Sequence, residues 1–384
     1  MDYFFTEEQV MIRDLARKIA EEKIVPVREH YDRTGEFPRD IYKIIAEADL
    51  CGIYIPEEYG GLGGGVTEMA IATEQLSWGC GGIALSFAAT GLGTYPILLF
   101  ASEAQKKIYL PAIASGEKIA AFGLTESDAG SDAGRVRTSA VLDGNEYVLN
   151  GTKQWITNGG EADVYTIIAT TQPGRGARGL SAFIVDKDTP GFTFGKKEDK
   201  MGIRASVTRE LIFQDCRIPK ENLLGKEGQG FRVAMSTLDK SRPGVASQAV
   251  GIAQAAFDEA IRYSKQRVQF DQSISSFQGI QFMLADMATK IEASRALLYA
   301  VTKLIDSGSK DYGKESAMVK VFASDTAMAV TVDAVQILGG YGYMKEYPVE
   351  KMMRDAKITQ IYEGTNQIQR LVIARQLIRE SAQQ

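Results

Sequence analysis

The chain has 384 residues, a formal net charge of −5 at pH 7, and 45% hydrophobic residues. This length predicts two or three domains, and the acidic balance argues against a nucleic-acid partner, which would need a basic face. The N-terminal sequence lacks the basic and apolar regions of a secretory signal. We also expect no membrane span, because we find no uninterrupted apolar stretch of the ~20 residues that a span needs.

The single histidine and the three cysteines exclude several kinds of site. His30 lies among charged residues and is expected on a helix surface. Without a second histidine, a His-rich metal site is impossible and a Ser-His-Asp hydrolase would depend on His30 alone. Cys51, Cys80 and Cys216 match neither a zinc spacing nor a disulfide framework, so we expect buried, unreactive thiols in a reducing compartment. Chemistry must come from carboxylates, Lys, Tyr or a bound cofactor.

Residues 1–117 are predicted to form an N-terminal helical domain. Thr6 and Gln9 have the spacing of a capping box, and apolar residues then recur at helical spacing through Ile19. Further helices are predicted over 39–48, 67–78, 83–91 and 102–113. The glycine-rich segment 56–65 lacks the Lys-Ser/Thr ending of a P-loop, which favours a flexible connector over a phosphate-binding loop.

Residues 118–228 are predicted to form a compact β-barrel or sandwich domain. Strands are expected over 140–142, 147–149, 165–168, 181–185 and 210–213, separated by Gly, Pro and Asp turns. Asp143-Gly144 is a hairpin signal between the first two strands.

Residues 229–384 are predicted to form a four-helix bundle. Long Ala-rich periodic segments cover 246–267, 277–305 and 314–338, and the glycines at 339–342 end the third. Pro243 is expected at the first position of the first helix, where a proline is well tolerated. A tail helix after Thr365 is expected to complete the bundle.

The segment Ile361–Arg370 places one carboxylate on a tight turn. Thr365 or Asn366 can cap the helix that follows, and Gly364 permits a sharp turn and a close approach by a ligand. Glu363 would then stand just outside the helix N-terminus. On these residues alone, an ordinary helix start with a solvated glutamate is an equal alternative.

This segment resembles the C-terminal signature of the acyl-CoA dehydrogenase family, in the short- or medium-chain type whose catalytic glutamate is C-terminal. The order of N-terminal helices, middle β domain and C-terminal bundle is similar to the α+β architecture of that family over essentially the whole chain. The resemblance implies that Glu363 removes a substrate α-proton, and that FAD lies between the β domain and the bundle. It also implies a homotetramer, built as a dimer of dimers, in which a neighbouring subunit supplies part of the FAD site.

Three further segments look like cofactor contacts of that family. By resemblance, Thr125 bonds the flavin pyrimidine edge, Trp155 covers the dimethylbenzene side, Thr157 donates toward N5, and Arg267 meets the pyrophosphate across the dimer. The residues alone leave ordinary alternatives, namely a β-turn, a core tryptophan and a charge at a helix C-terminus. The cofactor-binding residues that the resemblance implies are Phe122, Leu124, Thr125, Gly130, Ser131, Trp155, Ile156, Thr157, Arg267, Phe270, Gln278, Gln336, Ile337, Leu338, Gly339, Gly340, Thr365, Asn366 and Gln367.

Residues 238–246 resemble the segment that lines the acyl and pantetheine channel. Instead of contacting a substrate, Asp239 and Arg242 could form a local ion pair with each other. Some relatives carry their catalytic glutamate in this segment, but this sequence has Ser241 and no Glu between Leu238 and Ala246. The resemblance therefore leaves Glu363 as the base. The implied substrate-binding residues are Ser131, Asp239, Arg242, Val245, Tyr362 and Gly364.

The implied reaction is FAD-dependent α,β-dehydrogenation of a short- or medium-chain acyl-CoA, with electrons passing to an electron-transfer flavoprotein. A helix terminus favours the Glu363 anion, but burial beside an acyl chain raises its basicity, and we expect desolvation to dominate.

Four other readings stay open. Two are other acyl-CoA chemistries, namely the same reaction on a cyclic or branched acyl-CoA such as an alicyclic carboxyl-CoA, for which Ala88, Ala89 and Gly91 leave room, and enoyl-CoA reduction. The third is a flavin oxidase of the same fold. The fourth is a non-catalytic FAD- or CoA-binding scaffold, which would not need Glu363. We expect a cytoplasmic location, and a mitochondrial matrix location would require a transit peptide that has been removed.

Overall fold

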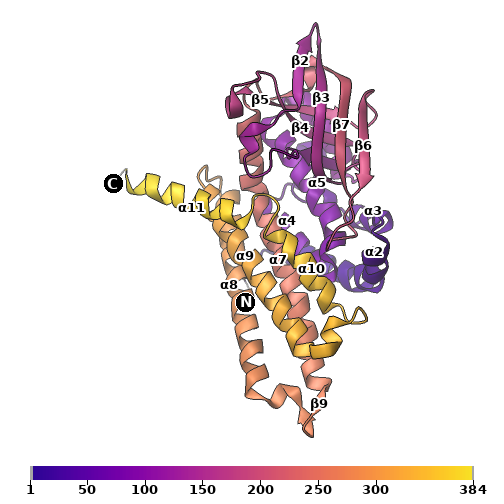
Figure 1. The fold of residues 1–384 in the computed structure, drawn as a ribbon, viewed down its shortest axis with the longest axis vertical. Coiled ribbons are helices and arrows are strands. Elements are labelled where there is room, and N and C mark those ends of the chain that lie inside the picture. The colour runs from indigo at the N-terminus through magenta and orange to yellow at the C-terminus, as the bar shows by residue number, and fades with distance from the viewer. Residues whose placement is uncertain (1–2, 383–384) are drawn as a thin grey trace.

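The computed structural model describes residues 3–382 as a group of helices, a β-sheet and a second group of helices (Figure 1). The capping box of Thr6 and Gln9 is confirmed, and the predicted helices of the N-terminal region are present. His30 is exposed on the second helix, as expected. The main helices of this region are α1 (Glu7–Ile19), α2 (Arg28–Thr34), α3 (Arg39–Glu47), α4 (Val66–Gly79), α5 (Gly81–Phe100) and α6 (Glu103–Ala114).

The middle region is one eight-stranded mixed sheet. Its strands pair in the order β6-β7-β3-β2-β4-β5-β8, with β1 added beside β4. Only one residue pair, Ser139 with Thr170, joins β2 to β4, so the sheet consists of two halves that meet at this point. The strands are β1 (Ala120–Gly123), β2 (Ser139–Asp143), β3 (Glu146–Thr157), β4 (Val164–Thr170), β5 (Leu180–Asp186), β6 (Phe192–Lys197), β7 (Thr208–Pro219) and β8 (Leu223–Leu224).

The predicted hairpin between β2 and β3 is present. Asp143 pairs with Glu146, which leaves Gly144 and Asn145 as a two-residue loop. Gly144 has a φ of 64°, the left-handed conformation that this kind of loop requires and that glycine adopts without strain.

The last region contains long helices that continue away from the sheet. These are α7 (Gly230–Gln266), α8 (Gln278–Asp306) and α9 (Gly313–Leu338), followed by the shorter α10 (Val349–Thr359) and α11 (Asn366–Ser381). A small hairpin of β9 (Val268–Gln269) and β10 (Gln272–Ser273) joins α7 to α8 at the end of the molecule farthest from the sheet (Figure 1).

Pro243 does not begin a helix, because α7 starts at Gly230 and passes through it. A proline inside a helix leaves the carbonyl four residues earlier without its donor. Here that carbonyl belongs to Asp239, and it accepts a hydrogen bond of 2.5 Å from the Ser316 hydroxyl on α9. The neighbouring helix replaces the missing donor, which explains why the sequence signal for a helix start was wrong.

The fourth helix of the bundle is α10, not the tail helix. Val349, Met352 and Ala356 of α10 belong to the apolar core that α7, α8 and α9 share. By contrast, α11 buries only Asn366 and Gln369 and projects from the body of the molecule (Figure 1). Its apolar residues Leu371, Leu377 and Ile378 are exposed in the single chain.

Within residues 3–382, two helices are long and apolar enough to cross a membrane by length and composition alone, although the sequence shows no uninterrupted apolar stretch of that length. They are α5 and the segment Gly313–Tyr343, with mean hydropathies of 1.6 and 1.4. Interspersed Gly, Ser and Thr residues hid them from a search for uninterrupted apolar runs. In α5, 72% of the apolar window is buried within the fold, which is the property of a core helix. It packs against β1 and β4 of the sheet and against α4 and α7.

The glycine-rich segment 56–65 is packed rather than a free connector. A Cβ atom at Gly61 would lie 2.0 Å from the Ile55 carbonyl oxygen, and one at Gly64 would lie 2.3 Å from that of Ile53. The glycines are therefore needed because the backbone passes close to itself at this turn.

Candidate active site

The Glu363 turn lies between α10 and α11 and has an unusual backbone conformation. Glu363 has a φ of 51° and Gly364 a φ of 91°, so two consecutive residues are left-handed. For a residue other than glycine this conformation costs about 1–3 kcal/mol and persists only where the surroundings enforce it. A Cβ atom at residue 364 would also lie 2.6 Å from the side-chain amide nitrogen of Gln369. Together with the positive φ, this close contact favours glycine at the position.

Polar groups from two helices enforce this turn. The Gln369 side-chain amide donates to the carbonyl oxygens of Glu363 and Gly364, at 3.0 and 2.9 Å. The Lys320 ammonium on α9 donates to the Gly364 carbonyl at 2.9 Å. The Thr365 hydroxyl accepts from the Ile368 amide, which confirms the predicted helix cap. The turn is thus held on both sides of Glu363.

The Glu363 carboxylate is half-buried and accepts a hydrogen bond from the Ser241 hydroxyl on α7. Burial raises the pKa of Glu363, whereas the Ser241 hydrogen bond and the charges of Arg242 and Lys320 lower it. The balance is upward, as the desolvation argument predicted. A carboxylate with a raised pKa is a stronger base than a solvated one.

Asp239 and Arg242 form the local ion pair that was the alternative to a substrate contact. Arg242 is only 3% exposed, and its guanidinium donates to the Asp239 carboxylate at 2.5 Å. Burial raises the pKa of Asp239, and Arg242 opposes that rise. The Arg242 Nε also points at the Glu363 carbonyl oxygen, at 3.5 Å. Arg242 therefore acts within the fold, between Asp239 and the Glu363 turn.

Glu126, which directly follows Thr125, is a buried carboxylate that forms an ion pair. Its carboxylate accepts from Lys153 at 2.7 Å and from the backbone amides of Arg137 and Thr138 at 2.7 and 2.9 Å. Burial acts to raise the pKa of Glu126, but the Lys153 charge and these hydrogen bonds outweigh it, so the pKa is lowered. This carboxylate is stabilised as an anion and is a weak base.

An apolar cluster lies next to the Glu363 turn. Tyr362 and Ile358 pack there against α5. The Tyr362 hydroxyl donates to the Gln248 side chain on α7, which fixes the ring beside Glu363. The buried members of this cluster are Leu85, Ala89 and Ile203, and Ala88 is partly buried against them.

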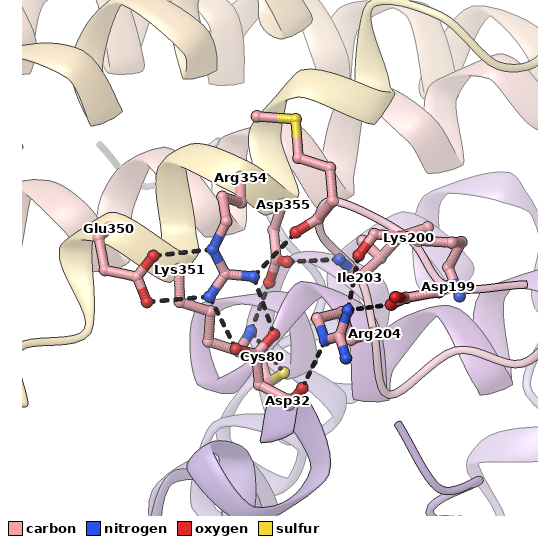
Figure 2. A network of polar contacts seen from close by, with 11 residues as sticks. Asp32, Cys80, Asp199, Lys200, Ile203, Arg204, Glu350, Lys351, Arg354 and Asp355 are labelled. Carbon is pink, nitrogen blue, oxygen red and sulfur yellow. Dashed lines mark hydrogen bonds and ion pairs between the residues drawn. The ribbon is translucent and has the colours of Figure 1, made fainter. Parts of the chain in front are cut away.

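Ile203 reaches this cluster from a strained loop between β6 and β7. It has a φ of 44°, which is rare for a β-branched residue. Its amide donates to the buried Asp355 carboxylate at 2.5 Å, and Lys351 forms an ion pair with the other oxygen of Asp355 (Figure 2). The Lys351 ammonium also lies 3.1 Å from the sulfur of Cys80. Asp355 thereby fixes the backbone of Ile203 against α10.

An outer layer of charges holds the same loop. Arg354 pairs with Glu350 and Asp32, both at 2.7 Å, and Arg204 donates to the Asp32 carbonyl oxygen at 2.8 Å (Figure 2). These contacts connect α2, α10 and the 199–204 loop, which are far apart in the sequence. Cys51, Cys80 and Cys216 are buried free thiols, as predicted, and Cys80 contacts Lys351 of this network.

The first group of predicted cofactor residues lies on adjoining strands of the sheet. The Gln154 amide donates to the Thr125 carbonyl at 2.8 Å, which places residues 122–125 beside residues 154–157. Trp155 has a φ of 56°, stands at a bulge of β3 and is 59% exposed, so it is not a core tryptophan. Phe122, Leu124 and Ile156 are buried. Gly130 and Ser131 are exposed and lie on the turn that follows β1.

The second group includes Arg267, directly before β9, which lies at the end of the molecule far from the sheet that carries the first group (Figure 1). Arg267 and residues 337–340 line a cleft of about 530 Å³ with Tyr263, Tyr341 and Met344. The Arg267 guanidinium lies 5.6 Å from the centre of the Tyr341 ring. Phe270, Gln278 and Gln336 are exposed near this end, outside the cleft lining. One chain therefore does not bring the two groups together.

Among the remaining predictions, Thr365, Gln367, Tyr362 and Gly364 lie on or beside the Glu363 turn, and Val245 is buried in α7. Asn366 is buried, and its side chain is occupied by Lys320, Ser324 and Asp325. It supports the turn from within.

Sequence reasoning assigned no role to Lys320, Gln369 or Gln248, and it noted Ser241 only because a glutamate was absent there. A signal existed for Lys320, because this charged residue shares a helix face with Ala317, Ser324 and Ala327, which are small and buried. A lysine on such a face indicates a specific partner. Gln369 and Gln248 carry no such signal, because glutamine is common on exposed helix faces.

Family models cover most of the chain. The N-terminal domain of acyl-CoA dehydrogenases matches residues 6–117, the middle domain residues 121–216, and the C-terminal domain residues 228–378. These enzymes are FAD-dependent oxidoreductases of fatty acid oxidation.

Three similar proteins align over almost their whole length. An acyl-CoA dehydrogenase of Bacillus subtilis is 51% identical, over 97% of this chain and 98% of the relative. An acryloyl-CoA reductase (NADH) of Anaerotignum propionicum is 51% identical, over 99% and 96%. A short-chain-specific acyl-CoA dehydrogenase of Clostridium acetobutylicum is 49% identical, over 99% and 100%.

Solved structures have the same fold. A chain from work on the electron transferring flavoprotein of Acidaminococcus fermentans is 53% identical with a TM-score of 0.96, over 99% of this chain and 100% of that one. Butyryl-CoA dehydrogenase of Megasphaera elsdenii is 47% identical with a TM-score of 0.96, over 98% and 100%. An acyl-CoA dehydrogenase of Bacillus anthracis complexed with FAD is 38% identical with a TM-score of 0.94, over 100% and 68%. The three-part fold, the site around Glu363 and these similarities lead to one conclusion: the chain belongs to the acyl-CoA dehydrogenase family.

Proposed function

We propose that this protein dehydrogenates a short-chain, or at most medium-chain, acyl-CoA to the 2-enoyl-CoA, with Glu363 as the base. The observation that carries the proposal is the Glu363 carboxylate, which is half-buried, has a raised pKa and adjoins an apolar cluster. Of the other two carboxylates considered, Glu126 is paired with Lys153 and Asp239 with Arg242. The short-chain preference is supported by the relatives that are named short-chain and butyryl-CoA dehydrogenases.

The site residues fit FAD at both groups described above. An exposed Trp155 beside Thr125 suits a flat ring system, and a cleft with Arg267 suits a phosphate. When bound, FAD supplies the acceptor for the hydride that leaves the substrate β-carbon. Glu363 takes the α-proton onto its carboxylate, and its backbone N–H is the proposed donor to the thioester carbonyl as negative charge develops there. The apolar cluster excludes water from the base.

The separation of the two groups supports a shared FAD site. The Arg267 cleft lies beside β9, and Trp155 lies on β3 of the sheet at the other end of the molecule (Figure 1). A second subunit would place both groups against one FAD molecule, which supports a dimer. We propose that such dimers pair into a homotetramer, and that the protein is cytoplasmic. A similar chain from work on an electron transferring flavoprotein supports such a flavoprotein as the electron acceptor.

The direct test is anaerobic addition of acyl-CoA thioesters to the FAD-loaded protein, followed by loss of flavin absorbance. Butyryl-CoA and its neighbours in length are expected to bleach the flavin fastest, and branched and cyclic thioesters more slowly. If no acyl-CoA bleaches the flavin, the proposed reaction is wrong. Fast bleaching by a cyclic or branched thioester alone would change the substrate assignment and keep the chemistry.

Enoyl-CoA reduction is the second candidate, because a relative with 51% identity is named an acryloyl-CoA reductase (NADH). The same residues serve both directions, since the acid that returns the α-proton is the base that removed it. The direction is measured by adding short enoyl-CoA thioesters to the reduced flavin. Faster flavin reoxidation than flavin reduction, at matched concentrations, would favour the reductase.

A further inference from the structure

Lys320 is a buried cation that the reaction above does not use. It is 0% exposed on α9, and its ammonium donates to the Gly364 carbonyl and to the Asn366 side-chain oxygen, both at 2.9 Å. Both acceptors are neutral, and within residues 3–382 Lys320 takes part in none of the ion pairs. Burying a cation without a paired anion is costly. An uncharged residue would fill the same space at a lower cost, so the charge itself requires an explanation.

The polar and charged groups around Lys320 and Glu363 come from α5, α7 and α9 and from the turn before α11. Glu363 is faced by Ser241 and Arg242 from α7, by Lys320 from α9 and by Tyr95 from α5, with Tyr362 next to it in sequence. Lys320 is faced by Glu363, by Arg242, and by Asp325 of its own helix. Asp239 neutralises much of the charge of Arg242, through a contact of 2.5 Å. Lys320 has no such ion-pair contact, and its charge lowers the pKa of Glu363 in addition to the effect of Arg242.

We propose that Lys320 is a positioning residue for the base: its ammonium holds the Gly364 carbonyl, which fixes the left-handed Glu363 turn, and its charge keeps the Glu363 carboxylate ionised until substrate binds. This inference rests on the proposed role of Glu363. The geometric part follows from the hydrogen bond to the residue directly after Glu363. The electrostatic part follows from the low dielectric around both groups, which strengthens their attraction.

The titration of Lys320 sets the sign of the pH effect. Burial lowers the pKa of Lys320 to about 7, and the Glu363 charge partly opposes this. Below this pH the ammonium is charged and lowers the pKa of Glu363. As the pH rises through about 7 the charge of Lys320 is lost, and with it the lowering effect of that charge on the pKa of Glu363. The charge of Lys320 therefore matters most under acidic conditions.

The test is the pH dependence of anaerobic flavin reduction in the FAD-loaded protein and three variants, at acyl-CoA concentrations well below saturation, where the rate reports the ionisation of the free enzyme. Lys320→Met removes the charge and the donor, Lys320→Gln removes the charge and keeps a donor, and Lys320→Arg keeps both. Lys314→Met, in the first turn of the same helix with Glu380 as its partner, is the matched control. FAD content and circular dichroism establish that each variant is folded.

In Lys320→Met and Lys320→Gln the acidic limb of the rate profile is expected to move to higher pH. In Lys320→Gln, a shift of one pH unit would lower the rate about tenfold below the pKa of Glu363 and leave it nearly unchanged at alkaline pH. Lys320→Met also loses the donor to the Gly364 carbonyl, so its rate should in addition fall at every pH. Lys320→Arg and Lys314→Met should keep the limb of the unmodified protein. A limb that does not move in the Gln variant would overturn the electrostatic part, and a normal alkaline rate in Lys320→Met would overturn the geometric part.

The same measurements separate this proposal from that of the function. If the unmodified protein reduces its flavin and the Lys320 variants show no pH shift, only the role of Lys320 is wrong. If no acyl-CoA reduces the flavin of the unmodified protein, the proposed reaction is wrong. If Lys320→Met does not fold, the comparison of Lys320→Gln with Lys320→Arg still decides the electrostatic part.

Discussion

At the scale of single residues, the site consists of one carboxylate and the groups that set its basicity. Glu363→Gln keeps the size and shape of the side chain but removes the base. We expect acyl-CoA to bind and the flavin to stay oxidised, with a rate loss of at least about 10²–10⁴-fold, because this is the contribution of positioned proton transfer. Anaerobic stopped-flow absorbance measures this loss.

Asp239→Asn is the control for Glu363→Gln, because Asp239 is another carboxylate of the predicted substrate segment and forms an ion pair with Arg242. This variant should weaken binding or positioning without abolishing flavin reduction. Near-normal flavin reduction by Glu363→Gln would show that the base has been assigned to the wrong carboxylate.

Ser241 tunes the same carboxylate from α7. Its hydroxyl donates to Glu363 and lowers the pKa of Glu363, against the upward effect of burial. Ser241→Ala removes this donor, so the pKa of Glu363 rises further and the acidic limb of the rate profile moves to higher pH. The rate at pH 6 should fall more than the rate at pH 9. A profile that keeps its shape and position would show that this hydrogen bond does not persist in the working enzyme.

At the scale of the elements, a buried ion pair between Lys153 and Glu126 links two parts of the sheet near Trp155. The side chain of Lys153 is 0% exposed and that of Glu126 is 8% exposed, and their contact joins β3 to the turn after β1. Burial lowers the pKa of Lys153 to about 8, even with Glu126 beside it.

Lys153→Met leaves the Glu126 carboxylate buried without its cation. Removing one partner of a buried pair costs about 3–5 kcal/mol of unfolding free energy. Urea unfolding followed by circular dichroism measures the change, and Lys43→Met is the matched control. Lys43 and Glu47 form an exposed pair, with side chains 74% and 63% exposed, which is worth at most about 1 kcal/mol. Equal losses in the two variants would contradict the prediction.

At the scale of the whole molecule, two separated groups of residues must meet on one FAD. Arg267 lines the cleft beside β9, at the end of the molecule far from the sheet. A hydrogen bond from a charged group to phosphate is worth about 1.5–3 kcal/mol, so Arg267→Ala should weaken FAD retention and change the stability of the apoprotein much less.

Equilibrium dialysis of FAD and thermal unfolding of the apoprotein test this prediction together. Arg262→Ala is the control, because Arg262 pairs with Glu259 one turn earlier on the same helix. Sedimentation of the purified protein should show a yellow tetramer. Unchanged FAD affinity with a lost fold would show that Arg267 is structural, and a stable colourless monomer would contradict the shared site.

The sequence by itself determined the local features. The Gly364-Thr365 turn and cap, the Thr6 capping box and the Asp143-Gly144 hairpin were all correctly predicted, because each depends on residues at most a few positions apart. The order of helices, strands and helices was predicted for the same reason. The helix start predicted at Pro243 was wrong, because the hydroxyl that replaces the missing donor belongs to Ser316 on another helix.

Only the tertiary structure decided what surrounds Glu363. Ser241 precedes it by 122 residues, and the amide of Ile203 reaches Asp355 across 152 residues. No local pattern encodes such contacts, because helix packing and the sheet topology create them. The resemblance of the sequence to a family singled out Glu363 as the proposed base, whereas its burial, its hydrogen bond to Ser241 and the nearby charge of Lys320 arise because α5, α7, α9 and the turn before α11 meet at one place.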